Sequence, residues 1–205
     1  GPAAARAMHA ARRGLRGLCI DRGARDGAGA RWINGVARQA FVDADVGLPE
    51  APELRHAARG AFPLLAGRGP TRVTLRDHGV LDVDMRSLVA RLQRQAREAG
   101  AAVVGRGSLQ RLEGTQAFTS QGTVRAECIV DASGATGARL LEQPKTRARE
   151  LCAAAQFVFR VTDSAAADRF FAQHEAEVGD TLCFGGVAGG YSILNVKRHG
   201  DELDV

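Results

Sequence analysis

The chain has 205 residues and a formal net charge of +5; hydrophobic residues make up 45% of it and charged residues 25%. This composition is ordinary for a soluble globular protein and excludes disordered, collagen-like and disulfide-scaffold chains. No apolar run approaches the roughly 18 residues that a membrane-spanning helix needs, so we expect no membrane span. The first residues lack the pattern of a secretory signal.

The basic residues are nearly all arginines, because Lys145 and Lys197 are the only lysines among the 28 basic side chains. They are scattered along the chain, and aromatic residues make up only 5% of it. A nucleic-acid groove would need clustered basic residues with interleaved aromatic ones. We therefore expect no nucleic-acid partner.

The cysteines and histidines show no metal-binding pattern. None of the four cysteines forms a C-x-x-C pair, and the five histidines have no ligand spacing, so we predict no metal site. We expect buried free thiols in a reducing compartment, and hence a cytoplasmic protein. The cysteines are Cys19, Cys128, Cys152 and Cys183.

The first half of the chain opens with an alanine-rich segment that predicts a helix ended by Gly14. A short apolar strand over 15–21 follows and ends in Asp21. A glycine-rich loop, a partly helical stretch and a proline-rich irregular stretch are then expected at 22–30, 31–47 and 48–70.

From residue 72 onward, short strands surround one clear helix. Asp84 is expected to cap this helix, whose apolar residues recur every three to four positions until Gly100. A second helix is expected at 164–176, with Ser164 as its cap. Strands are predicted at 72–76, 80–83, 101–104, 108–112, 117–120, 123–130, 151–161, 181–184, 191–196 and 202–205.

The opening helix fits part of a dinucleotide-binding fingerprint. Such a fingerprint places small residues at a helix start and an acid about 20 residues further on, which holds the ribose. Gly1 and Ala4 match two of the small positions, and Asp21 matches the acid. The first strand and first glycine would lie before residue 1. Two plain interpretations compete: an alanine-rich helix packed on any sheet, and a Gly-Pro remnant of expression.

Three segments, in order, resemble the p-hydroxybenzoate-hydroxylase-type FAD oxidoreductases, which include geranylgeranyl reductases and flavin-dependent halogenases. They are the opening GPAAARAMHAARRGLRGLCIDR, then DVDMRSL at 82–88 with its helix up to Gly100-Ala101, and CIVDASG at 128–134. A further segment at 31–35, RWING, has the character of a loop near the flavin. The resemblance spans residues 1–140.

The resemblance implies a role for eight residues in FAD binding, and no covalent catalytic residue. Those near the pyrophosphate would be Gly1, Ala3 and Ala4. Asp21 would bind the adenosine ribose and Arg22 would lie beside the adenine or its phosphates. Arg86 would face the phosphate–ribityl region, and Asp131 and Gly134 would sit at a second turn near the cofactor.

Three features depart from the family pattern. Ala4 replaces the usual Gly, Ser133 stands where the group often has Asp, and no later G-D-A-A-G-like segment is present. The implied fold class is α/β, with a Rossmann-like ββα FAD-binding domain and part of a mostly antiparallel substrate-domain sheet. The expected FAD-binding domain covers 1–71 and 84–149, and the substrate-domain strands cover 72–83 and 150–205.

The implied function is an FAD-dependent oxidoreductase that acts on an organic small molecule, as a monooxygenase or a double-bond reductase. NAD(P)H is a candidate reductant. We expect the chain to be truncated at both ends. The alternatives are a nicotinamide-only Rossmann dehydrogenase, which would alternate strands and helices after residue 21, and a non-functional fragment of a flavoprotein.

Overall fold

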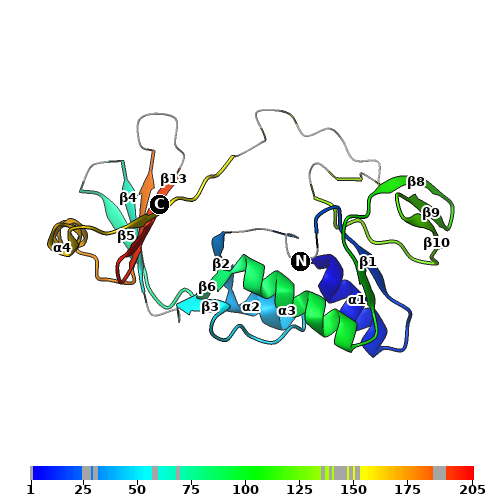
Figure 1. Cartoon of the computed structure of the whole chain (residues 1–205). Coiled ribbons are helices and arrows are strands. Elements are labelled where there is room, and N and C mark those ends of the chain that lie inside the picture. Colours follow the sequence, from blue (N-terminus) through cyan, green and yellow to red (C-terminus); the bar gives the residue numbers. More distant parts are fainter. Residues whose placement is uncertain are drawn as a thin grey trace. The chain divides into compact units, whose positions relative to one another are not determined.

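The structure is a computed structural model, and its chain divides into two compact units (Figure 1). The first unit comprises Gly1–Asn34, Phe41–Glu53 and Val83–Leu151, and the second comprises Gly35–Ala40, Leu54–Asp82 and Cys152–Val205. The structure describes residues 2–24, 29, 32–56, 60–67, 70–134, 137–138, 140, 147, 150, 153–186 and 193–205.

The first unit is built on two helices that pack against each other, α1 (Pro2–Arg12) and α3 (Met85–Glu98). Beside them, β1 (Leu18–Ile20) pairs in parallel with β7 (Ala102–Val104). The predicted cap of α3 is confirmed, because the Asp84 carboxylate accepts a hydrogen bond from the Ser87 amide at 2.9 Å. The small face of α1 is buried through Ala4, Ala7 and Met8.

A three-stranded antiparallel sheet completes the first unit, in the order β10-β9-β8. Its strands are β8 (Leu109–Glu113), β9 (Gln116–Thr119) and β10 (Gly122–Arg125). The strand predicted at 123–130 is too long, because the pairing of β10 with β9 ends at Arg125.

The second unit holds a six-stranded, mostly antiparallel sheet in the order β11-β14-β13-β12-β4-β5; only β12 and β4 run in parallel. Helix α4 (Ser164–Gln173) buries Phe171 against Leu65, Leu182 and Val196. The strands are β4 (Phe62–Ala66), β5 (Arg72–Leu75), β11 (Val158–Arg160), β12 (Thr181–Gly185), β13 (Ile193–His199) and β14 (Glu202–Asp204).

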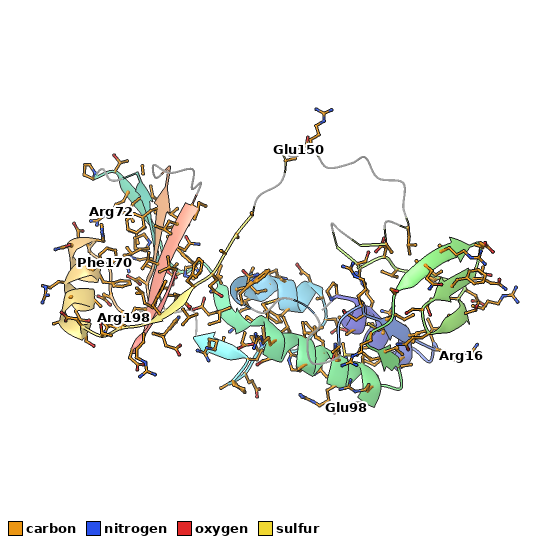
Figure 2. All side chains as sticks on the ribbon, turned by 45° about the horizontal axis from the view of Figure 1, so that its top comes forward. Arg16, Arg72, Glu98, Glu150, Phe170 and Arg198 are labelled. Carbon is orange, nitrogen blue, oxygen red and sulfur yellow. The ribbon has the colours of Figure 1, made fainter. Side chains whose placement is uncertain are left out.

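Ion pairs tie α4 and the turn after it to this sheet. Arg198 pairs with Asp168 of the helix, and Arg72 pairs with Glu175 just after it. Figure 2 labels Arg72, Phe170 and Arg198 in this part of the unit. The cap of α4 is Asp163 and not the expected Ser164, because the Asp163 carboxylate accepts from the Ala166 amide at 2.9 Å.

Of the remaining elements, one strand belongs to the second unit, and the other two strands and a short helix have residues in both units. These strands form a further three-stranded sheet in the order β2-β6-β3. Their bounds are β2 (Ile33–Ala37), α2 (Arg38–Asp43), β3 (Leu54–His56) and β6 (Val80–Asp84). Among the described residues, no helix is long and apolar enough to cross a membrane.

Several sequence expectations need correction. The stretch 48–70 contains β3 and β4 and is not wholly irregular. The strand expected at 151–161 is present only at 158–160, with 151–152 outside the described residues. Cys19 and Cys183 are buried free thiols as expected, whereas Cys128 is exposed; Cys152 lies outside the described residues.

The coarse fold class is confirmed, since the chain is a mixed α/β protein with several sheets. The finer ββα arrangement of an FAD-binding domain stays a prediction. The observed units also differ from the expected domain bounds: residues 35–40 and 54–71 belong to the second unit, although they were expected in the FAD-binding domain.

Candidate functional site

The start of α1 is the first part of the predicted site. Ala4 is 2% exposed and Ala3 is half-buried, while Gly1 lies outside the described residues. The first turn of the helix carries no acidic side chain. Since the amide groups of a helix start attract anions, a first turn of small residues without an acidic side chain is compatible with a phosphate there.

The end of β1 fixes the predicted ribose-binding acid. The Asp21 amide donates to the Val104 carbonyl at 2.9 Å, and the Asp21 carbonyl accepts from the Gly107 amide at 2.9 Å. Its carboxylate accepts from the Gly23 amide through Oδ1 at 2.7 Å. These hydrogen bonds fix the backbone and the carboxylate of Asp21, which is half-buried, whereas the neighbouring Arg22 is exposed.

The start of α3 carries Arg86, which is exposed. The segment after β1 reaches this helix, because the Met85 amide donates to the Trp32 carbonyl at 3.2 Å. Gly29 also lies on the helix, and a Cβ built on it would stand 2.7 Å from Cγ2 of Val89. The fold thus brings Gly29 and Trp32 to the first turns of the helix, where Arg86 lies.

The turn after residue 130 is organised by Asp131. Its Oδ1 accepts hydrogen bonds from the Ser133 hydroxyl and, at 2.9 Å, from the Ser133 amide, while Oδ2 accepts from the Leu140 amide at 3.0 Å. These hydrogen bonds, the hydroxyl first, lower the pKa of Asp131. Gly134 adopts a positive φ of 79° in the same turn.

All eight predicted site residues fall in the first unit. Among those that the structure describes, no hydrogen bond or ion pair joins one of these side chains to another. The donor set nevertheless fits FAD: small residues and a helix start for the pyrophosphate, a carboxylate for ribose hydroxyls, and exposed arginines for phosphate.

The structure also contains a buried ion pair on α3 that the sequence does not predict. The Arg91 guanidinium of α3 donates to both carboxylate oxygens of Glu53, with Nε–Oε2 at 2.6 Å and an Nη2–Oε1 distance of 2.8 Å. Glu53 lies in the stretch that was expected to be irregular. In the sequence, Arg91 is only a basic residue beside the apolar face of a predicted helix. The spacing of residues along the chain does not reveal that its partner is Glu53, 38 positions away.

No protein-family model and no curated protein matches the chain. Solved structures do match it over its whole length. A geranylgeranyl bacteriochlorophyll reductase-like protein from Thermoplasma acidophilum has a TM-score of 0.68 at 17% identity, covering 100% of this chain and 54% of its own.

Two further structures extend the likeness. PqsL, a probable FAD-dependent monooxygenase from Pseudomonas aeruginosa, has a TM-score of 0.63 at 11% identity, covering 100% of this chain and 57% of its own. The myxobacterial chondrochloren halogenase CndH, a variant of FAD-dependent halogenases, has a TM-score of 0.57 at 18% identity, covering 100% and 49%.

The chain spans about half of the length of these proteins. It shares the fold of a reductase-like protein, a probable FAD-dependent monooxygenase and an FAD-dependent halogenase. The three groups are those to which the sequence motifs pointed, so the predicted resemblance is confirmed at the level of the fold.

Proposed function

We propose that the first unit binds FAD and that the protein is an FAD-dependent oxidoreductase acting on an organic small molecule. One observation carries the proposal. Asp21 stands at the carboxyl end of β1, which runs parallel to β7 and follows a helix whose first turn is small and free of acids. This is the arrangement that a dinucleotide requires for its pyrophosphate and ribose.

Each predicted residue then has a chemical task. Amides at Gly1, Ala3 and Ala4 would bind the pyrophosphate, and Asp21 would accept hydrogen bonds from the ribose. Arg22 and Arg86 would pair with phosphate oxygens. The Asp131 carboxylate already accepts hydrogen bonds from Ser133 and Leu140. Asp131 would therefore shape its turn, and backbone groups around Gly134 would contact the cofactor. FAD itself would supply the electron transfer.

The second unit would supply part of the substrate-binding domain. Its mostly antiparallel six-stranded sheet suits the expected substrate-domain sheet. We propose a monooxygenase or double-bond reductase reaction with NAD(P)H as reductant, and no covalent catalytic residue. PqsL has been crystallised with 2-aminobenzoylacetate, an example of a small organic ligand in this fold. The cytoplasmic location stays a prediction.

A nicotinamide-only dehydrogenase is the second candidate. It would continue with alternating strands and helices after β1, whereas here the three antiparallel strands β8, β9 and β10 follow β7. This order favours the flavoprotein assignment.

The test is cofactor binding by the protein expressed from its complete reading frame. FAD and NAD(P)H are each titrated by calorimetry, and visible flavin absorbance is followed through gel filtration. The proposal expects FAD to bind and to co-elute with the protein. Binding of NAD(P)H without FAD would support the dehydrogenase, and binding of neither would overturn the proposal.

A further inference from the structure

We propose that Glu53 is a positioning residue for cofactor binding, which acts by fixing the start of α3 and with it Arg86. This inference rests on the proposed FAD-binding function. Glu53 lies in the first unit, just before β3; its side chain contacts α3, and its backbone contacts Asp84, the residue that caps α3.

The side-chain contact is a buried, two-pronged ion pair. The Glu53 side chain is only 6% exposed and that of Arg91 is 15% exposed. Both carboxylate oxygens are used, and the Arg91 guanidinium donates further to the Gly47 carbonyl at 3.0 Å. A planar guanidinium that makes two parallel bonds to a carboxylate fixes orientation as well as distance.

The backbone contact of Glu53 is at the start of α3, about two helical turns before Arg91. The Glu53 carbonyl accepts from the amide of Asp84, and the Asp84 carboxylate in turn caps the helix through the Ser87 amide. One residue therefore holds α3 at its cap and again at Arg91, about two helical turns later. Arg86 lies between these two points of attachment.

Two residues that follow β1 in the chain, Gly29 and Trp32, contact the same turns independently of Glu53. The Trp32 carbonyl accepts from the Met85 amide, and Gly29 packs on Val89. The helix start is thus bound by Glu53 and by Gly29 and Trp32. Because a phosphate contact by Arg86 gains most when its backbone is fixed beforehand, this double attachment would raise the affinity for FAD.

A purely stabilising role would not require this pair. Replacing a buried ion pair by well-packed apolar residues is often neutral or stabilising, so burial of charge is weak evidence for stability alone. The same helix carries an exposed pair, Arg94–Glu98, with side chains 59% and 64% exposed, which serves as the matched control. Glu98 is labelled in Figure 2.

The test is a double-mutant cycle on the full-length protein, with the Kd for FAD measured by calorimetry and Tm measured in parallel. Glu53→Gln should raise the Kd by about 2- to 30-fold, the range of couplings carried by packed networks. In an Arg86→Ala background the same change should leave the Kd nearly unaltered, because its effect passes through Arg86. Glu98→Gln should leave the Kd unchanged.

A second variant separates positioning from loss of folding. Glu53→Met combined with Arg91→Met should keep Tm near that of the wild type, yet the Kd for FAD should stay raised. The inference would be overturned by an unchanged Kd for FAD in this variant, or by an equal effect of Glu53→Gln on the Kd with and without Arg86. Neither result would contradict the proposed FAD binding itself. Failure of the wild type to bind FAD would instead overturn the proposed function and this inference with it.

Discussion

Gly17 approaches Ala7 of α1 so closely that a Cβ on Gly17 would stand 2.9 Å from the Ala7 carbonyl oxygen and 3.4 Å from the Ala101 Cβ. The chain entering β1 thus touches both the helix backbone and the residue before β7. This close approach explains why α1 presents alanines on its inner face, and it fixes the helix beside the strand that ends at Asp21.

Gly17→Ala should therefore destabilise the first unit by overpacking, by about 1–3 kcal/mol. The matched control is Gly14→Ala, where a Cβ would meet nothing within 4 Å but the φ of +76° would be strained. That strain should cost about 1–2 kcal/mol without moving α1. Chemical denaturation measures both. If Gly17→Ala left the free energy of unfolding unchanged, the close packing of helix on strand would be contradicted.

The environment of Asp204 leads us to expect that removing its charge stabilises the second unit. Burial and the nearby Glu202 raise the pKa of Asp204, while Arg55 and Lys197 oppose the shift. Its Oδ1 atom is buried without a hydrogen-bond partner among the described residues. A raised folded-state pKa means that the charged form costs stability at pH values above the group's ordinary pKa, and that this cost disappears as the pH falls below it.

Asp204→Asn should therefore raise the free energy of unfolding at neutral pH, by less than about 1 kcal/mol given the partial exposure of the side chain. Near the ordinary Asp pKa of 3.8 and below, the difference from the wild type should vanish. Urea denaturation at both pH values measures this. A variant less stable than the wild type at neutral pH would refute the interpretation.

The turn held by Asp131 should persist in acid. Since the folded-state pKa of Asp131 is lowered, its contribution is present above the ordinary Asp pKa and is lost only as the pH falls through the lower folded-state value. NMR titration of the Ser133 and Leu140 amides should give a midpoint below 3.8. The methyl signal of buried Met8 reports whether the unit stays folded. A midpoint at or above 3.8, with that signal unchanged, would show that the carboxylate does not hold the turn.

The best-predicted elements are those whose signals are local. The helix after Asp84 was predicted because its cap and its apolar period lie within the segment itself. Strand β4 was missed because Pro63 argues against a strand, yet its pairing with β12 begins only at Leu64, so the missing amide disrupts no bond on that side. Strand β11 is shorter than its apolar run because β14 pairs with it only over Val158–Arg160, with one further pair of backbone hydrogen bonds between Phe157 and Val205.

The candidate site was predictable only in part, for the same reason. Asp21 could be proposed because its spacing from the helix start is visible along the chain. The pairing of Glu53 with Arg91 joins segments that the fold alone brings together, so no spacing rule could indicate it. A turn-forming role for Asp131 could be proposed from the sequence, because Asp is a common turn residue, but its particular partners Ser133 and Leu140 could not.

The most direct test of the account is the affinity for FAD of an Asp21→Asn variant of the full-length protein. The amide keeps the size of the side chain and can still accept from the Gly23 amide, but it loses the charge that binds ribose hydroxyls. Hydrogen bonds to a charged group contribute about 1.5–3 kcal/mol, so the Kd should rise by roughly ten- to hundredfold with Tm nearly unchanged. An unchanged Kd in this variant would contradict the placement of the adenosine ribose at the end of β1.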